Sequence, residues 1–331
     1  MATALLALHC GAAETDTPAD DDEGALAQQA APRDFAKYPV VVTVPSFNEL
    51  YAVSDLHGRY DRLVDLFRES GLIKRTDEDT PPKALEWTGG SAILVVCGDA
   101  IDKGPQSVEV LDALMSLETK AAAAGGRVIF LLGNHEAEFL ADPHNDKASR
   151  TRKDAIGINV ELGKLSPAIA PDTFASADDP HGKWLRTRPL AAKVGDWFFS
   201  HGGSTQGLSL GELDVELRGA LTTKGYGAPA IIGDDSILEA QEWYGKDYKV
   251  ARKNADALGV AHIVFGHDPA AFGETPEIRE KDHGLLFAID TGLGAAETKG
   301  FVLHVHKKAG KVVAEAISHV QGEAPQKLWD D

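Results

Sequence analysis

The chain has 331 residues, of which 43% are apolar and 25% charged, which suffices for one large α/β domain with an appendage or for two ordinary domains. Its 51 acidic residues outnumber the 33 basic ones and give a formal charge of −18. This charge argues against nucleic acid as a partner, because no Lys- or Arg-rich run offers a local basic groove.

The first 38 residues are predicted to form a disordered acidic tail. Residues 1–13 are apolar and lack Lys and Arg, and an acidic segment rich in Thr and Pro follows. The sequence leaves two localisations open: a soluble cytoplasmic protein, or a protein exported or lipid-anchored through a leader that ends near Cys10. No run of about 18 apolar residues occurs, so no transmembrane segment is predicted. The only other cysteine, Cys97, lies in an apolar run, and no disulfide or Cys-based zinc site is expected.

Short apolar strands that run into polar or glycine-containing turns recur from Phe47 onward. The predicted strands cover 51–54, 92–97, 127–132, 197–200, 262–265 and 285–289. Their continuous apolar character predicts a sheet that is covered on both faces. Helical spacing of apolar residues follows the first two strands, over 60–70 and 107–124, which is the pattern of a βαβ unit.

Three further regions complete the predicted organisation. Residues 138–190 are polar with weak strand signals and are predicted to be a helical cap insertion, and 202–245 is expected to be an irregular excursion. Residues 301–306 and 312–318 are predicted to form a closing hairpin. The main domain would therefore span 39–320, and 321–331 would be a flexible tail.

Polar side chains with metal-binding chemistry follow five of the predicted strands. In open α/β sheets the carboxyl ends of the strands face the crevice where ligands bind. The strand ends should therefore bring six such side chains to one edge: Asp55, His57, Asp99, Asn134, His201 and His267.

This set of side chains predicts a site for two metal ions. Carboxylate, amide and imidazole groups without a thiolate suit manganese, iron or zinc. Six ligands are too many for one tetrahedral ion but suit two ions that share a carboxylate. Two ions about 3.5–4 Å apart can clamp a phosphoryl group and lower the pKa of a bound water. For Asn134 alone, a helix N-cap is the competing interpretation.

The ordered series of motifs resembles the phosphoprotein phosphatase family within the calcineurin-like metallophosphoesterases. The motifs are Asp55-x-His57-Gly58, Gly98-Asp99-x-x-Asp102-Lys103-Gly104, Gly133-Asn134-His135-Glu136, His201-Gly202-Gly203 and Gly266-His267. The stretch from Trp184 to Pro189, leading to Phe199, is most similar to the Shewanella-like bacterial and plant branch. The resemblance implies an α/β fold with central β-sheets in a sandwich, flanked by helices.

The resemblance also implies roles for these residues. Asp55 and His57 would bind the first ion, Asp99 would bridge, and the second ion would be held by Asn134, His201 and His267. Manganese is expected first, with iron or zinc as alternatives. His135 would be the general acid and Asp102 would orient it and raise its pKa, in a reaction where a metal-activated hydroxide attacks phosphorus directly. The competing interpretations are a supporting residue for His135 and a helix cap for Asp102.

Two departures from the family pattern concern the phosphate clamp. Lys103 stands where the family usually has arginine, and lysine lacks the bidentate fork that grips a phosphate. The segment 242–246, where a second arginine is expected, contains none. We therefore expect the clamp to use Lys103 together with Arg59, Arg186 or Arg188, with Arg59 first. The alternatives are a surface arginine for Arg59 and pairing with acids of the cap for the other two.

The resemblance implies a phosphatase that acts on phosphoserine, phosphothreonine or phosphotyrosine in proteins. The alternative is a nucleotide or dinucleoside-polyphosphate hydrolase on the same dinuclear site, because nucleotide-cleaving relatives differ around Lys103. A non-catalytic phosphate-binding protein would have lost metal ligands, and none is lost here. The expected partner is thus a phosphorylated protein or a small phosphoester.

Overall fold

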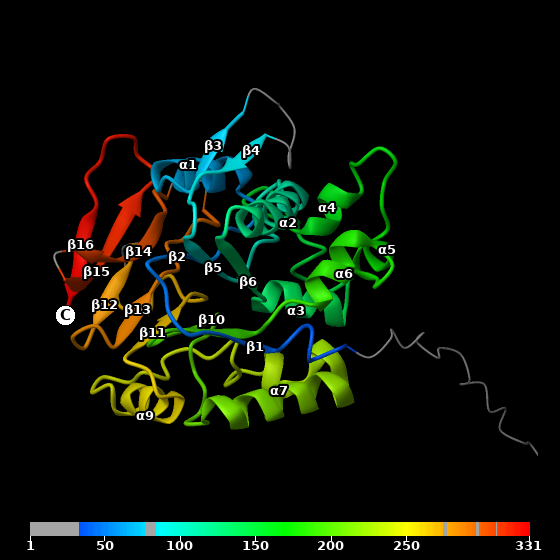
Figure 1. Ribbon diagram of the computed structural model, residues 1–331. Coiled ribbons are helices and arrows are strands. Elements are labelled where there is room, and N and C mark those ends of the chain that lie inside the picture. Colours follow the sequence, from blue (N-terminus) through cyan, green and yellow to red (C-terminus); the bar gives the residue numbers. More distant parts are fainter. Residues whose placement is uncertain (1–32, 77–83, 274–276, 296–297, 309) are drawn as a thin grey trace, which may run out of the picture. The chain divides into compact units, whose positions relative to one another are not determined.

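Two six-stranded sheets form the centre of the protein (Figure 1). The computed structural model describes residues 33–76, 84–273, 277–295, 298–308 and 310–331. The first sheet has the strand order β16-β15-β14-β2-β5-β6, and the second has the order β1-β9-β10-β11-β13-β12. The fold is therefore α/β with central sheets flanked by helices, as the resemblance implies, and the strands that the apolar pattern grouped in one covered sheet divide between the two.

The first sheet contains three parallel strands beside an antiparallel hairpin. The parallel strands are β2 (Glu49–Val53), β5 (Ile93–Cys97) and β6 (Arg127–Leu131). The hairpin strands β14 (Phe301–Lys308) and β15 (Lys311–Ser318) confirm the predicted hairpin. Between the parallel strands come α1 (Tyr60–Glu69), the small ribbon β3 (Ile73–Arg75) and β4 (Leu85–Trp87), and α2 (Ser107–Ala123).

The second sheet holds the later strands. Its central strands β10 (Trp197–Ser200) and β11 (His262–Phe265) are parallel and fully buried. The other members are β1 (Val41–Val44), β9 (Ala191–Val194), β12 (Arg279–Lys281) and β13 (Leu286–Ala288). The predicted strands at 197–200 and 262–265 are thus confirmed, and that at 285–289 is confirmed as the shorter β13.

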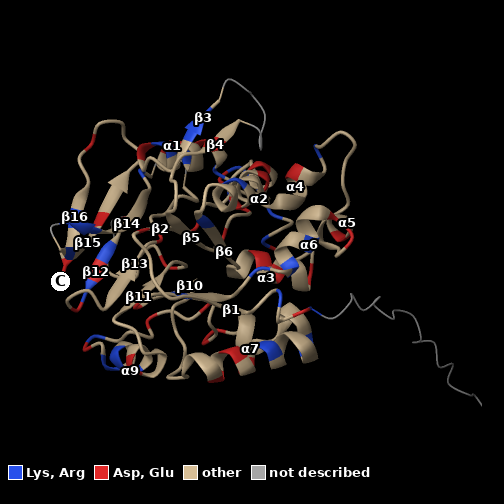
Figure 2. Ribbon diagram, viewed as in Figure 1, with Lys and Arg blue, Asp and Glu red and all other residues tan. Residues whose placement is uncertain are grey.

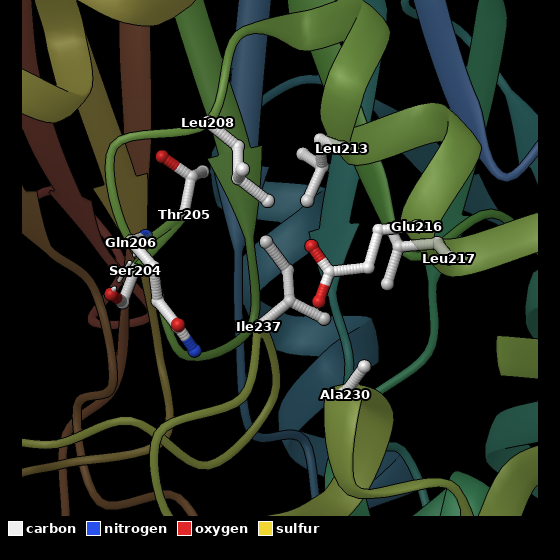
Figure 3. Close-up of a pocket in the computed structure, with 9 residues that line it drawn as sticks. All are labelled: Ser204, Thr205, Gln206, Leu208, Leu213, Glu216, Leu217, Ala230 and Ile237. Atoms are coloured by element: carbon white, nitrogen blue, oxygen red, sulfur yellow. Dashed lines mark hydrogen bonds between the residues drawn. The ribbon is translucent and has the colours of Figure 1, made fainter. Parts of the chain in front are cut away.

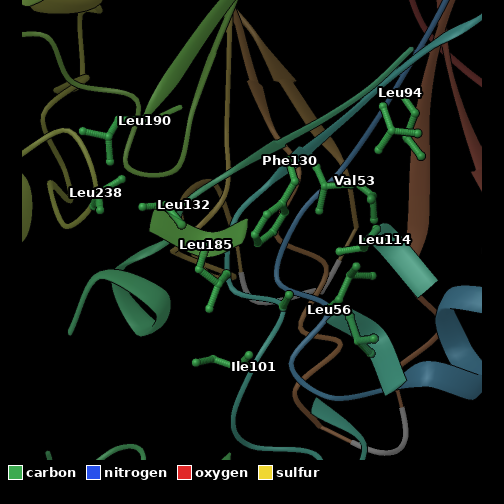
Figure 4. Close-up of a cluster of buried hydrophobic side chains, with 14 of the residues drawn as sticks. Val53, Leu56, Leu94, Ile101, Leu114, Phe130, Leu132, Leu185, Leu190 and Leu238 are labelled. Atoms are coloured by element: carbon green, nitrogen blue, oxygen red, sulfur yellow. The ribbon is translucent and has the colours of Figure 1, made fainter. Parts of the chain in front are cut away.

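The hydrophobic core has two parts. One cluster lies between the sheets and includes Cys97, which is a buried free thiol. The other lies under the helices: it joins the face of the first sheet that α1 and α2 cover with residues of the cap, of α7 and α9, and of strands of the second sheet. Figure 4 shows Val53, Leu114 and Phe130 in this second cluster. Helix α1 belongs to it because its apolar positions recur on one face.

The predicted cap is a set of short elements after β6. It begins with α3 (Asn134–Ala141) and continues through a ribbon of two antiparallel strands, each two residues long, to three short helices. These elements are β7 (Thr151–Arg152), β8 (Ala155–Ile156), α4 (Ile158–Leu162), α5 (Pro171–Ala175) and α6 (Pro180–Arg186).

The excursion at 202–245 is irregular at both ends, as expected, but its middle part is helical. Helix α7 (Leu210–Lys224) starts at a reciprocal cap in which Ser209 and Glu212 satisfy each other's backbone N–H groups. This Ser-x-x-Glu spacing is a helix-start signal. The turn η1 (Gly225–Gly227) and α8 (Pro229–Ile232) follow, and α9 (Lys249–Leu258) precedes β11. Acidic and basic residues are mixed along α7 (Figure 2), where Asp214 and Arg218 pair at 2.8 Å.

Both described ends of the domain pack against the rest of it, although flexible tails were expected there. Residues 326–330 form β16 (Gln326–Asp330), which pairs with β15, and Trp329 packs edge-on against Trp197 and His262. The flexible tail predicted at 321–331 is therefore wrong. Residues 33–38 were assigned to the N-terminal tail, but the Arg33 guanidinium donates hydrogen bonds to carbonyls of residues 38–39 and 186–188. Cys10 and the rest of that tail lie outside the described residues.

Among the residues that the structure describes, no helix combines the length and apolarity that crossing a bilayer requires.

His181 links the cap helix α6 to α2 and provides a test by pH. Its Nε2 lies 2.8 Å from Asp112 Oδ1 on α2, and its ring stacks on Phe174 at 4.5 Å. Burial lowers the pKa of His181, but the hydrogen bond to Asp112 and the charges of Asp112 and Asp179 outweigh it, so the pKa is raised. The stability from this contact is therefore complete below the unfolded pKa of about 6.5 and is lost as the pH rises through the folded pKa.

We expect the His181→Gln variant to lose about 1 kcal/mol of unfolding free energy at pH 6 relative to wild type, and less at pH 9. Urea unfolding at the two pH values measures the difference. Equal losses at both values would show that the imidazolium contact does not stabilise the cap.

Candidate dinuclear metal and catalytic site

The predicted site residues come together where strands of both sheets end. Asp55 and His57 follow β2, Asp99 follows β5, and His201 and His267 follow β10 and β11 of the other sheet. Asn134 and His135 occupy the first turn of α3, directly after β6. Apart from His267, whose ring is largely buried, these side chains are almost inaccessible to solvent. The one edge expected from the sequence is therefore a junction between two sheets.

The loops that carry these side chains adopt an uncommon backbone conformation. Positive φ values, which side-chain-bearing residues rarely adopt, occur at Asp55, His57, Asp99, Asp102, Lys103 and His267. Such strain persists where the surroundings fix it and is concentrated at functional sites.

Two glycines allow the loops to approach the carboxylates. A Cβ atom on Gly133 would lie 2.1 Å from Asp99 Oδ1, and one on Gly266 would lie 2.4 Å from Asp55 Oδ2. Both distances are far below contact, so neither position accepts a side chain without displacing a carboxylate. The glycines of these motifs are therefore required by close approach as well as by turn geometry.

Asp99 is at the centre of the cluster and faces two histidines with different oxygens. Its Oδ2 lies 3.6 Å from His57 Nε2, and its Oδ1 lies 3.3 Å from His201 Nε2. Asp55 Oδ1 is also 3.6 Å from His57 Nε2, and Asn134 Oδ1 lies 3.1 Å from His201 Nε2. Asp99 thus stands between two groups of donors, as a shared ligand must.

Backbone carbonyls hold both histidines in one orientation. His57 Nδ1 lies 3.1 Å from the carbonyl of Ile101, and His201 Nδ1 lies 2.6 Å from the carbonyl of Cys97. Because a carbonyl can only accept, each Nδ1 carries its proton toward the carbonyl. In the neutral ring Nε2 then keeps its lone pair and points at Asp99, which is how proteins fix imidazoles for an ion.

The charges of the cluster are unbalanced in the protein alone. Burial, and then the charge of Asp99, raise the pKa of Asp55. Burial would lower the pKa of His201, yet the charges of Asp99 and Asp55 raise it to about 10. Asp290, buried close by, has a pKa well above its ordinary value because of burial and the charge of Asp55. Buried carboxylates in this number require compensating cations.

The donor set fits two divalent ions. Ligand atoms of His57, Asp99 and His135 lie within 4.8 Å of one another, and so do those of Asp55, Asp99 and His201. The two groups share Asp99 and contain oxygen and nitrogen donors without sulfur, the combination suited to manganese, iron or zinc.

His135 and Asp102 form a buried pair beside this cluster. His135 Nδ1 lies 2.7 Å from Asp102 Oδ2, and its Nε2 lies 3.8 Å from Asp99 Oδ2. Burial opposes protonation of His135, but the charge of Asp99 and the hydrogen bond to Asp102 outweigh it and raise the pKa of the ring. The other oxygen of Asp102 accepts the N–H of Ile158 at 2.8 Å, so the cap fixes its direction.

Comparison with known families assigns the chain. Residues 49–271 match the sequence pattern of the calcineurin-like phosphoesterases. The chain belongs to this family. The fold, the hydrolase class and the implied dinuclear divalent-metal site of the phosphoesterase follow from this membership, whereas the identity of the metal does not.

Relatives of the phosphoesterase carry different names. An uncharacterized protein of Schizosaccharomyces pombe is 27% identical over 301 residues, 85% of this chain and 82% of that protein. Shewanella-like protein phosphatase 2 of Arabidopsis thaliana is 37% identical over 87 residues, 26% of this chain and 20% of that protein. A symmetrical bis(5'-nucleosyl)-tetraphosphatase of Cronobacter sakazakii is 29% identical over 140 residues, 42% of this chain and 37% of that protein. The last two matches span well under half of the relatives' own length.

Solved structures share the fold of the phosphoesterase. The cold-active protein-tyrosine phosphatase of a psychrophilic Shewanella species superimposes with a TM-score of 0.68 at 21% identity, over 88% of this chain and 82% of that one. A protein serine/threonine phosphatase of Saccharomyces cerevisiae gives 0.55 at 16% identity, over 89% and 88%. At these identities the similarity establishes the architecture alone.

Glu136 holds two loops of the phosphoesterase site together, a role that the sequence analysis did not predict. Its carboxylate accepts the N–H groups of Asp99, Ala100, Ile101 and Gly133 at 2.8–3.1 Å. One buried side chain therefore ties the loop after β5 to the loop after β6. The Gly-Asn-His-Glu motif contains the signal, because a glutamate in the first turn of a helix can accept backbone N–H groups.

The residues predicted for the phosphate clamp divide into two pairs. Lys103 reaches the cluster, where its Nζ lies 2.6 Å from His57 Nε2. Arg59 donates to the carbonyl of Gly294. Gly294 itself lies close to the cluster, because a Cβ atom placed on it would contact Lys103 and His57. Arg188 instead pairs with Glu118 at 2.7 Å and stacks over Trp184. Arg186 stacks over the Tyr226 ring and donates to the carbonyl of Ala175. The expectation that these two arginines join the clamp is therefore not met, because both are engaged within the cap and with α2.

Lys147 is a cation at the site that sequence analysis missed. It donates to Glu138 Oε1 and lies 3.8 Å from Glu239, and Glu138 Oε1 also accepts from Asn134 Nδ2 at 3.2 Å. Glu138 therefore orients the Asn134 amide. No local pattern identifies Lys147, because its position depends on how the cap folds back.

A separate small pocket lies between the loop after β10 and α7. Figure 3 shows Leu213 and Ile237 facing each other across it. Its volume of about 20 Å³ admits roughly one water molecule. It is therefore no substrate site.

Proposed function

We propose that the phosphoesterase hydrolyses phosphomonoesters on protein side chains, namely phosphoserine, phosphothreonine or phosphotyrosine. The observation that carries the chemistry is the His135–Asp102 pair, which aims a protonated nitrogen at a donor cluster centred on Asp99. An acid placed beside such a cluster suits transfer of a phosphoryl group away from an alkoxide or phenoxide that needs a proton.

The proposed ligands are those expected from the sequence. Asp55, His57 and Asp99 would hold the first ion, and Asp99 would share the second with Asn134, His201 and His267. When bound, the two ions supply a water of lowered pKa as nucleophile and neutralise charge on the phosphoryl oxygens. Manganese is the proposed metal, with iron or zinc as alternatives.

His135 is proposed to protonate the leaving oxygen at its Nε2. Asp102 holds Nδ1 and so fixes both the tautomer and the direction of the ring. Burial lowers the pKa of His135, but the charge of Asp99 and the hydrogen bond to Asp102 outweigh it and raise the pKa, the direction that a leaving-group acid requires.

Lys103 and Arg59 are the proposed phosphate-binding groups, with Lys147 at the rim. The Lys103 ammonium lies against the nitrogen of His57 that would face an ion. With His57 Nε2 engaged by an ion, the Lys103 ammonium would leave this position and would turn toward a phosphoryl oxygen.

The balance of charge at the rim supports a monoester substrate. Lys147 is paired with Glu138 and lies near Glu239, whose pKa rises to about 7 because of burial and its hydrogen bond to Glu138. A tetraphosphate carries several negative charges and would meet these acids with few cations to balance them. The relatives named as bis(5'-nucleosyl)-tetraphosphatases nevertheless make a nucleotide hydrolase the second candidate.

Rates on phosphopeptides and on diadenosine tetraphosphate test the substrate class. The enzyme is stripped of metal, reloaded with manganese and first checked on p-nitrophenyl phosphate. A higher kcat/KM on phosphopeptides supports the proposal, and a higher value on the tetraphosphate replaces it with the second candidate. Loss of all turnover in the reloaded enzyme would contradict both.

The Asp102→Asn variant tests the acid. We expect kcat on phenyl phosphate to fall by about 10²–10⁴-fold, because the variant loses the orientation and charge that keep His135 protonated. On p-nitrophenyl phosphate the fall should be much smaller, since p-nitrophenolate leaves without a proton. Asp65→Asn, at an exposed position of α1 where Asp65 pairs with Arg68 at 3.1 Å, serves as the control. Equal losses on both esters would show that Asp102 acts by holding the fold.

A further inference from the structure

A second cluster of metal-ligating side chains lies on the helix-covered side of the first sheet. His304 and His306 are two residues apart on β14, so both point to the same face. On the neighbouring strands, Glu49 of β2 is opposite His306 and Glu315 of β15 is opposite His304. Three strands thus contribute four side chains to one patch, the β14 histidine patch.

The four side chains approach one another closely. His304 Nε2 lies 2.6 Å from Glu49 Oε2, and His306 Nε2 lies 3.1 Å from Glu315 Oε2. Ligand atoms of Glu49, His304 and His306 all lie within 4.8 Å of one another. Three of the four side chains are only 13–15% exposed, while Glu49 is 45% exposed and opens the patch to solvent.

Aromatic packing holds the histidines in place. The His304 ring stacks between Tyr51 at 4.2 Å and His306 at 4.3 Å, with the planes within 7° of parallel. Tyr51 thus covers the face of the His304 ring that points away from His306.

The patch carries excess negative charge at neutral pH. Glu49 and Glu315 bring two carboxylates to the histidines. Lys308 is the cation in ion-pair contact with the patch among the described residues, at 3.6 Å from Glu315 Oε1. A divalent cation would balance the remaining carboxylate charge.

We propose that the β14 histidine patch binds one divalent transition-metal ion of the zinc class. Two imidazoles with carboxylate oxygens form a donor set that zinc accepts in tetrahedral geometry, at about 2.0–2.2 Å. An ion must lie in the plane of each imidazole it binds, so the stacked rings must tilt apart. That tilt is a rotation about the soft terminal torsion of each histidine, on a partly open surface.

The patch is distinct from the catalytic cluster. Glu49 begins β2 and Asp55 lies beyond its other end, so the length of the strand, about 13 Å, separates them. An ion in the patch would cross-link β2, β14 and β15. It would therefore stabilise the sheet without entering the phosphatase reaction.

Zinc stoichiometry tests the proposal. The manganese-loaded enzyme is dialysed against micromolar zinc, and bound zinc is counted by elemental mass spectrometry for wild type, His304→Ala/His306→Ala and Glu49→Gln. Wild type should retain one zinc per chain more than the double variant, and Glu49→Gln should bind that zinc at least about tenfold more weakly. Tyr51→Phe, which keeps the ring, is the matched control and should bind as wild type does.

Melting temperature and activity complete the test. Zinc should raise the Tm of wild type more than that of the double variant, because binding to the folded state stabilises by mass action. Turnover of p-nitrophenyl phosphate should be unchanged in every variant. Equal zinc counts and equal Tm shifts in wild type and the double variant would overturn the proposal, whatever the outcome for the catalytic site. If the double variant does not fold, Glu49→Gln decides, since it keeps the volume of the side chain.

Discussion

The Asp99→Asn variant is expected to lose phosphatase turnover by about 10³-fold or more while remaining folded. Asp99 is the one carboxylate whose two oxygens face the two donor groups, at 3.6 Å from His57 Nε2 and 3.3 Å from His201 Nε2. An amide replaces one oxygen by an NH₂ group that cannot bind a cation. A bound ion supplies several kcal/mol of transition-state stabilisation, and each 1.4 kcal/mol is a tenfold change in rate.

Metal content and turnover are measured together for this variant. We expect manganese to fall from two ions per chain to one or none. Asp172→Asn is the control, because Asp172 is an exposed aspartate that pairs with His144. A variant that keeps both ions and most of its turnover would show that Asp99 does not bridge.

The Gly133→Ala variant is expected to lose at least about 3 kcal/mol of unfolding free energy together with metal binding. The new Cβ would lie 2.1 Å from Asp99 Oδ1 and 2.4 Å from the Asp99 backbone nitrogen. Glu136 holds the Asp99 nitrogen by accepting its N–H together with that of Gly133, and Asp99 Oδ1 accepts the N–H of His135, so both atoms are fixed. Overpacking a rigid site costs about 1–3 kcal/mol, and disruption of the Glu136 network adds to it.

Gly219→Ala is the matched control for this change. Gly219 lies inside α7, and a Cβ there meets no atom within 4 Å. Alanine in a helix interior is more favourable than glycine by about 0.5–1 kcal/mol, so this variant should be more stable than wild type. Chemical denaturation of both variants, with a metal count for Gly133→Ala, measures the contrast. If Gly133→Ala unfolds like wild type, the two loops are less rigid than their hydrogen bonds indicate.

The sequence predicted the parts of this protein that depend on local pattern. Strands such as β5 and β10 are short continuous apolar runs, and the site residues follow them directly, so both could be located without a structure. The sheet to which each strand belongs could not be predicted, because β5 and β10 look alike in sequence. Pairing partners are chosen by contacts between residues far apart in the chain.

The phosphate clamp was the least predictable part of the site. Arg186 and Arg188 are suitable in chemistry, but the packing of the cap turns them toward Tyr226 and Glu118. Lys147 reaches the site because it lies opposite Glu138, nine residues earlier, across the turn that follows α3. Cations on an insertion have no strand end to fix their direction, so their roles require three-dimensional information.

The attachment of the cap to Asp102 limits how the substrate range of this enzyme can be changed. The N–H of Ile158 holds one oxygen of Asp102, and three residues later Glu161 accepts two N–H groups at the start of α2. The cap segment 158–161 is therefore also the segment that holds the partner of the proposed proton donor. Cap exchanges with relatives, whether by recombination or by design, should keep 156–161 with the recipient core, or specificity and turnover will change together.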